Sequence, residues 1–257
     1  MSKRYQKDRL TVEVCADRVE LGRRAGTDAA SAIRAAIEKK GRARVIFAAA
    51  PSQNEFLSAL CRESGIDWRR VHALHMDEYV GLPSDAPQGF GNFLRRAIFD
   101  KLPFGKVDYI GSEGDPGQLM ARYDAILSEK KVDVVFMGIG ENGHIAFNDP
   151  HVADFNDPLR IKKVDLDLKC RTQQVHDGCF ARLEEVPKYA LTLTVPALAA
   201  APRLFCIVPA PTKAEAVKAT VEGPVGAHCP ATVMRLHPNA TLYLDPDSAA
   251  LLQDSDA

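Results

Sequence analysis

Residues 43–60 read ARVIFAAAPSQNEFLSAL, and this stretch decides the fold. Residues 43–50 form a nearly continuous apolar run, which is typical of a strand that is buried on both faces. Ser52 and Glu55 follow with the spacing of a helix capping box, and apolar residues continue at helical spacing as far as Leu60. The pattern therefore predicts a buried strand that leads directly into a helix.

The same alternation of strands and helices recurs along the rest of the chain. We expect further strands at residues 71–76, 107–110, 132–137, 190–195, 203–208 and 241–244, and helices at 25–40, 90–99, 119–127 and 213–221. Elements of these lengths in alternation form βαβ units and a largely parallel sheet with helices on both faces. The sequence therefore predicts a single α/β domain over residues 1–257, in which ligands bind beyond the carboxyl ends of the strands.

The composition of the chain excludes several classes of protein. Of its 257 residues, 46% are hydrophobic and 26% are charged, a mixture typical of a folded globule rather than a disordered chain. The net charge of -1 provides no overall field for nucleic acid or anionic lipid, and no stretch approaches the roughly 20 apolar residues of a membrane span. The polar N-terminus has no apolar core of a signal peptide. We therefore expect a cytoplasmic protein without nucleic-acid or membrane partners.

The six cysteines are scattered along the chain and contain no C-x-x-C pair. Disulfide frameworks and zinc sites normally show tighter spacing, or occur in smaller secreted chains. We therefore expect reduced, mostly buried thiols and no metal site.

Two of the predicted strands are followed by groups that suit an anionic ligand. Ser52 and Gln53 open the helix after residues 43–50, where free backbone amides and a hydroxyl group suit a phosphate. The alternative is that Ser52 only caps its own helix. Lys213 lies after residues 203–208 in the opening of another helix, where the helix dipole disfavours a cation. Lys213 therefore indicates either an anionic ligand or a solvated surface lysine.

Two adjacent carboxylates, Asp77 and Glu78, directly follow the predicted strand at residues 71–76. Catalytic groups commonly occupy this position in α/β folds. A general base here could remove a proton from a carbon next to a carbonyl group. The alternative is that Asp77 caps a turn and that Glu78 is solvated. The sequence allows both interpretations, and we prefer the catalytic one.

The segment 138–150 reads GIGENGHIAFNDP, and it contains the G-x-G-x-x-G pattern of dinucleotide-binding proteins at Gly138, Gly140 and Gly143. The pattern lies in the middle of the chain, and Pro150 cuts short the long helix that a dinucleotide site requires. We therefore reject a nicotinamide cofactor. A tight loop that brings backbone amides and His144 to a substrate explains the glycines better. With Asp149 five residues further on, a chemical role for His144 is favoured over a structural one.

The motifs of this chain resemble those of the glucosamine-6-phosphate deaminase/isomerase family, which includes 6-phosphogluconolactonases. The resemblance rests on MDEYVGLP at 76–83, GIGENGHIAFNDP at 138–150, VPKYALT at 186–192, and Lys213 followed by VEG at 221–223. The run HIAFN favours the deaminase branch. The resemblance implies a Rossmann-like α/β fold, no redox cofactor, and conversion of an amino-sugar phosphate into a ketose phosphate with release of ammonia.

The resemblance also implies roles for individual residues. Asp77 would be the base that moves the C2 proton of the opened sugar. His144 would be the acid and base for ring opening, assisted by Asp149 at a position where the family has Glu. Lys213 and the helix start at Ser52 would hold the phosphate. Further candidates for contacts with the substrate or its phosphate are Gln53, Glu78, Gly138, Gly140, Arg171 and His176.

One departure from the family pattern concerns the proposed chemistry. Asn142 stands where the family usually has Asp, and an amide can orient an imidazole but adds no negative charge. We therefore expect Asn142 to weaken conventional deaminase activity and Asn142→Asp to raise it. The alternatives are a lactonase, in which His144 activates water, and a phosphosugar sensor without catalysis. The oligomeric state is left open between a monomer and a homo-oligomer.

Overall fold

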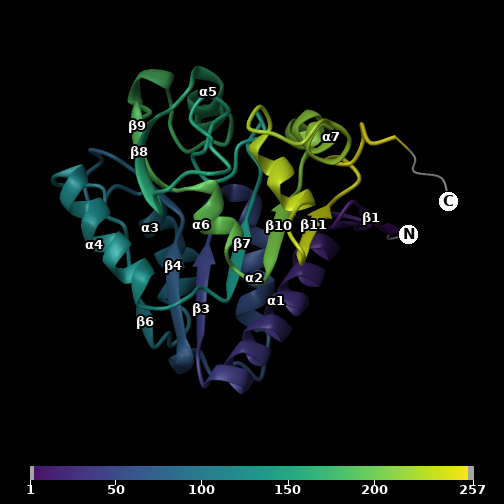
Figure 1. Cartoon of the computed structure of the whole chain (residues 1–257), viewed down its shortest axis with the longest axis horizontal. Coiled ribbons are helices and arrows are strands. Elements are labelled where there is room, and N and C mark those ends of the chain that lie inside the picture. The colour runs from purple at the N-terminus through teal and green to yellow at the C-terminus, as the bar shows by residue number, and fades with distance from the viewer. Residues whose placement is uncertain (1–2, 254–257) are drawn as a thin grey trace.

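The computed structural model describes residues 3–253, and a central eight-stranded sheet organises them (Figure 1). The strands lie in the order β1-β2-β11-β10-β7-β3-β4-β6. All neighbours are parallel except β1 and β2, which form an antiparallel pair at the edge. The bounds are β1 Lys3–Lys7, β2 Leu10–Val14, β3 Ala43–Phe47, β4 Val71–His75, β6 Lys106–Val107, β7 Val134–Met137, β10 Leu204–Val208 and β11 Ala240–Leu244. The predicted α/β class is confirmed.

Helices cover both faces of this sheet, as the apolar strands require. The helices are α1 Arg18–Lys40, α2 Asn54–Arg62, α3 Phe90–Leu94, α4 Pro116–Glu129, α5 Leu168–His176, α6 Val195–Ala199 and α7 Ala214–Glu222, and of these α5 lies beyond the strand ends rather than on a face. Strand β3 shows why its apolar run is continuous. Val45 and Phe47 belong to the core cluster beneath α1 and α2, whereas Ile46 belongs to the cluster on the opposite face with residues of α6 and α7. No described helix is both long and apolar enough to cross a membrane.

The strand predicted at 190–195 does not join the central sheet. It forms β9 (Tyr189–Leu193), which pairs antiparallel with β5 (Asp77–Tyr79) and β8 (Ile161–Asp165) in a separate three-stranded sheet. Figure 1 shows β8, β9 and α5 gathered beyond the upper ends of the central strands. The two carboxylates at the start of β5 thus lie where the chain passes from one sheet to the other.

Several elements have no signal in the apolar pattern of the sequence. Strand β1 is polar and mostly exposed because it pairs on one side only, and α5 is a short polar helix. The pattern also missed β2, β8 and the first turns of α1, and it extended β6 beyond its two residues. The helix predicted at 90–99 is present as α3, with helical turns that continue to Phe99. Helix α6 and the short strand β5 were also missed, and the remaining elements match their predicted positions within a few residues.

Candidate active site

A pocket that is open to solvent lies beyond the carboxyl ends of β3, β7 and β10. From β3 the chain proceeds outward to β4 and β6, and from β7 it proceeds in the opposite direction to β10 and β11. The pocket is therefore at the point where the strand order reverses, which is where open α/β sheets bind ligands. The predicted site residues that line it are Ser52, Gln53, Asp77, Gly138, Gly140, His144 and Lys213.

Asp77 is buried at the floor of this pocket, with 6% of its surface exposed. Burial, and then the negative charge of Glu78, hold the pKa of the Asp77 carboxyl well above its usual range. A carboxyl group whose pKa is raised toward neutrality is a stronger base than an ordinary aspartate. The interpretation of Asp77 as a surface turn cap is wrong, because its side chain is buried in the pocket.

His75 fixes the backbone that carries Asp77. Its Nε2 accepts a hydrogen bond from the Ile110 amide at 2.9 Å, so Nδ1 holds the proton and donates to the Asp77 carbonyl at 2.9 Å. Burial lowers the pKa of His75 to about 4, so the ring is neutral at physiological pH. This neutral imidazole therefore keeps Asp77 in one position.

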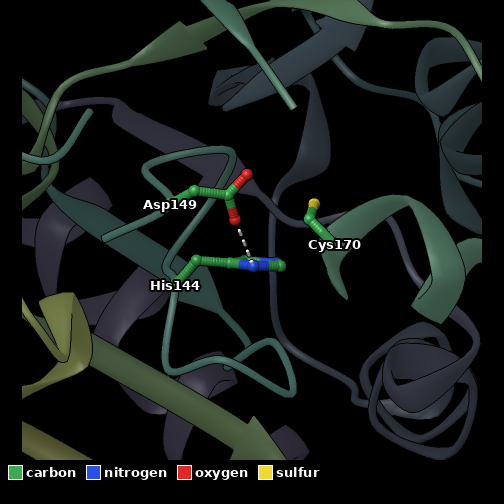
Figure 2. Close-up of side chains that lie close together, drawn as sticks. All are labelled: His144, Asp149 and Cys170. Atoms are coloured by element: carbon green, nitrogen blue, oxygen red, sulfur yellow. Dashed lines mark ion pairs between the residues drawn. The ribbon is translucent and has the colours of Figure 1, made fainter. Parts of the chain in front are cut away.

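His144 lies between the main chain of Gly140 and the carboxylate of Asp149. A Cβ atom at residue 140 would lie far closer than 3.0 Å to the imidazole ring, so only glycine fits beneath it. On the other side, Asp149 Oδ1 is 2.9 Å from His144 Nδ1. Figure 2 views the ring edge-on and shows the oxygen approaching from above the ring plane. The contact is therefore an ion pair without the alignment of a hydrogen bond.

Asp149 contacts His144 although its side chain is one methylene shorter than the Glu of the family pattern. The surroundings of Asp149 favour its ionised form. Burial opposes ionisation of Asp149, but His144 and Asn142 outweigh burial and place its pKa below the ordinary value. The side-chain amide of Asn142 donates to Asp149 Oδ1 and to Asp167 Oδ2, both at 2.9 Å. Asn142 therefore separates two carboxylates and also accepts a hydrogen bond from the His144 amide.

The capping box predicted for Ser52 and Glu55 is wrong. Helix α2 begins at Asn54 without a side-chain cap, and Glu55 forms an ion pair with Arg18 at 2.8 Å. The Ser52 hydroxyl instead accepts a hydrogen bond from Gln53 Nε2 and lines the pocket. Gln53 is itself fixed because the same nitrogen donates to the Ile207 carbonyl. Ser52 and Gln53 thus line the pocket and do not cap the helix.

Lys213 is buried, with 4% of its surface exposed, so the alternative of a solvated surface lysine is wrong. Burial lowers the pKa of its ammonium group, although the carboxylates of Asp177 and Glu141 partly oppose this effect. Among the described residues that line the pocket, Lys213 is the only lysine or arginine. A buried ammonium group next to the first turns of α2 and α7 suits a phosphate group.

Three of the predicted binding residues do not line the pocket. Glu78 is buried rather than solvated, and its carboxylate accepts hydrogen bonds from the Phe90 and Gly91 amides, which anchors the start of α3. Arg171 donates to the carbonyls of Leu183 and Val186 within its own segment. His176 is exposed at the end of α5, and its Nδ1 lies 3.6 Å from Glu141. Each of these side chains therefore contacts another part of the protein and lies outside the pocket.

The structure adds two pocket residues that the sequence did not indicate, Gln173 and Gln174 on α5. Gln174 Oε1 accepts a hydrogen bond from the Tyr79 hydroxyl at 2.8 Å. Gln173 Oε1 accepts one from the Glu141 amide at 2.9 Å, which ties α5 to the glycine-rich loop. Because α5 has no apolar periodicity, only its position in the fold identifies these amides as part of the site.

Comparisons with known proteins agree with this geometry. The family model described as glucosamine-6-phosphate isomerases/6-phosphogluconolactonase matches residues 16–243. The glucosamine-6-phosphate deaminase of Exiguobacterium sibiricum is 36% identical over 195 residues, which are 75% of each chain. That of Bacillus cereus is 35% identical over 196 residues, covering 76% of this chain and 72% of the relative.

Solved structures give the same picture at the level of the fold. A monomeric glucosamine-6-phosphate deaminase superimposes with a TM-score of 0.85 at 26% identity, covering 93% of this chain and 99% of the other. A 6-phosphogluconolactonase from Shewanella baltica superimposes with a TM-score of 0.74 at 14% identity, covering 91% and 97%. At that identity the lactonase shows the shared fold alone.

Proposed function

The chain belongs to the glucosamine-6-phosphate isomerase/6-phosphogluconolactonase family, and we propose that it converts glucosamine 6-phosphate and water into fructose 6-phosphate and ammonia. One observation carries this proposal. Asp77, a carboxylate with a raised pKa, shares a pocket at the strand-order reversal with His144 and with the buried cation Lys213. An enolising base, a proton shuttle and an anion site are the three groups that such a reaction needs.

The arrangement of the pocket supports a sequence of proton transfers. With the phosphate held by Lys213 and Ser52, the sugar extends toward the two acid–base residues. His144 moves the proton that opens the ring, and the Asp149 carboxylate stabilises the imidazolium that forms. Asp77 then takes the proton from C2 and returns it to C1, while O1 gains a proton and the amino nitrogen loses one, which leaves an imine at C2. Water adds to this carbon and ammonia leaves, which yields the ketose phosphate.

The direct test compares two substrates with one protein sample. We expect glucosamine 6-phosphate to give equal amounts of ammonia and fructose 6-phosphate, and 6-phosphogluconolactone to hydrolyse no faster than in buffer. Acid release from the lactone without ammonia from the amino sugar would establish the lactonase alternative. Thermal stabilisation by both phosphosugars without turnover of either would establish a sensor.

Lys213 is expected to act on substrate affinity more than on the chemical step. Lys213→Met keeps the length and apolar stem but removes a charged hydrogen-bond donor, which is worth about 1.5–3 kcal/mol. We therefore expect KM for glucosamine 6-phosphate to rise roughly 10- to 100-fold with a smaller change in kcat. Lys218→Met on α7, the helix that directly follows Lys213, is the control, because Lys218 pairs with Glu222 outside the pocket. An unchanged KM in Lys213→Met would contradict the assigned phosphate site.

Asn142→Asp is now expected to lower both stability and activity, contrary to the expectation from the family pattern alone. The substitution removes the donor that bridges Asp149 and Asp167 and places a third carboxylate between them. Asn142 is half-buried, so the uncompensated charge costs less than the roughly 3 kcal/mol of a fully buried site but still destabilises the fold. Thermal unfolding and ammonia release measure the two effects, with Asn142→Ala as the control that removes the bridge without adding charge. A gain in ammonia release from Asn142→Asp would overturn this assignment.

A further inference from the structure

Cys170 on α5 lies beside the pair formed by His144 and Asp149, and the proposed mechanism makes no use of its thiol. One potential ligand atom from each of these side chains lies within 4.8 Å of the other two, and all three residues are buried. Figure 2 shows the three side chains converging from the glycine-rich loop and from α5. The absence of a C-x-x-C pair therefore does not exclude a metal site, because the fold brings distant ligands together.

The donor set and the charges of this cluster fit Zn²⁺. Imidazole nitrogen, carboxylate oxygen and thiolate sulfur are all zinc ligands. The negative charges of Asp149 and a deprotonated Cys170 balance a divalent ion, so the buried complex carries no net charge. Zinc bonds of 2.0–2.3 Å place ligand atoms about 3.3–3.8 Å apart in a tetrahedron. The three ligand atoms lie within 4.8 Å of one another, so side-chain movements of about 1 Å bring them to the distances that zinc requires.

The geometry at His144 Nδ1 gives a second observation, because this nitrogen contacts Asp149 but forms no hydrogen bond. His144 Nδ1 is buried and has no hydrogen-bond partner, since Asp149 stands over the face of the ring. A metal needs the lone pair in the ring plane, so binding requires the imidazole to turn away from Gly140, where the ring already occupies the space that a side chain would take. The Asp149 carboxylate accepts hydrogen bonds from the Asn142 side chain and from the Asp167 amide, and carboxylate ligands of metals commonly have such partners.

We propose that His144, Asp149 and Cys170 form a Zn²⁺ site whose fourth position opens toward the pocket, and that occupancy of this site inhibits the enzyme. On binding, the Cys170 thiol releases its proton to solvent, and the metal forms bonds to nitrogen, oxygen and sulfur. The inhibitory effect rests on the proposed function, because the metal withdraws His144 and Asp149 from ring opening. Binding itself does not depend on that function.

Cobalt tests the binding without reference to activity. The reduced full-length protein is titrated with Co²⁺ alone, and we expect a near-ultraviolet thiolate-to-cobalt charge-transfer band that added Zn²⁺ abolishes. Cys170→Ala is expected to lose the band and to bind metal more than about 100-fold more weakly, since losing even an outer partner costs 10- to 100-fold. Cys170→Ser preserves the size of the side chain if the alanine variant is unstable.

His151→Ala is the matched control, because Asp149, His151 and Asp167 form a second group of potential ligands without a thiol. We expect its cobalt band and its zinc inhibition to equal those of the parent protein. No band in the parent protein, a band that persists in both Cys170 variants, or a band lost only in His151→Ala would each overturn the site.

Measuring ammonia release with and without Zn²⁺ separates the proposed metal site from the proposed function. We expect Zn²⁺ to reduce ammonia release at least about tenfold in the parent protein, while Cys170→Ala keeps its basal rate with and without the metal. A cobalt band without any turnover would support the site and count against the deaminase. Normal turnover without a band would overturn the site alone, and a band without inhibition would overturn the inhibitory role.

Discussion

Asp77→Asn is expected to reduce kcat/KM for glucosamine 6-phosphate by about 10²- to 10⁴-fold, the usual contribution of a general base, and at the same time to raise the melting temperature. The amide keeps the shape of the side chain but cannot accept the C2 proton. Substrate affinity is expected to change little, since Lys213 and Ser52 are untouched. A variant with parental turnover would show that another group is the base.

The gain in stability follows from the sign of the pKa shift. Burial raises the pKa of Asp77 in the folded protein above its value in the unfolded chain. Above the unfolded value, the folded state therefore binds more protons than the unfolded state, and stability falls as the pH rises through the folded pKa. Asn does not ionise, so this loss disappears. Each kcal/mol regained raises the melting temperature by roughly 2–4 °C in a chain of this size.

Two measurements check this link between charge and function. The difference in melting temperature between Asp77→Asn and the parent protein is expected to be small near pH 4 and to grow as the pH rises. The kcat/KM of the parent protein is expected to fall as the pH drops through the raised pKa of Asp77. A stability difference that does not change with pH would contradict the buried-carboxylate explanation.

Glu78→Gln is the matched control for the adjacent carboxylate and is expected to have the opposite effect on stability. Burial also raises the pKa of Glu78, but the Tyr79, Phe90 and Gly91 amides donate hydrogen bonds to its two oxygens and oppose this shift. Among the described residues, no such donors oppose the pKa shift of Asp77. A Gln amide group would direct its own hydrogens at one of these donors, which leaves a buried donor unsatisfied at a cost of about 1–3 kcal/mol. We therefore expect a lower melting temperature.

Gly140→Ala is expected to reduce kcat by about 10²-fold or more, although it adds a single methyl group. The new Cβ would overlap the His144 imidazole, so the ring must leave its place beneath Asp149. A displacement of about 1 Å in an acid–base group commonly costs this much in rate. Thermal unfolding measured alongside steady-state kinetics shows whether the loss reflects the site rather than the fold.

Gly138→Ala is the control in the same loop. Its Cβ would lie 3.2 Å from Gln53 Nε2, which must move by only a few tenths of an ångström and can keep its hydrogen bond to the Ile207 carbonyl. Neither glycine has a φ angle in the left-handed region, so alanine does not strain the backbone at either position. We expect a much smaller loss from Gly138→Ala, and equal losses in the two variants would contradict the specific role of Gly140.

The site residues identified from sequence are those that directly follow buried strands. Asp77, His144 and Lys213 come from segments far apart in the chain, yet all three line one pocket because parallel strands end at the same edge of the sheet. Arg171 was chosen for its charge and Glu78 for its position beside Asp77 after a strand, and neither criterion tells in which direction a side chain points. In the structure, Glu78 accepts a hydrogen bond from the Phe90 amide and Arg171 donates one to the Leu183 carbonyl.

The sequence by itself determined the class of the fold, because an apolar run such as residues 43–50 reports burial on both faces of a strand. It also determined the family, because short loops after strands carry their chemistry in consecutive residues. Only the tertiary structure decided the surroundings of those residues. The second sheet, the polar helix α5, the bridge made by Asn142 and the position of Cys170 depend on contacts between distant segments, and such contacts leave no periodic pattern in the chain.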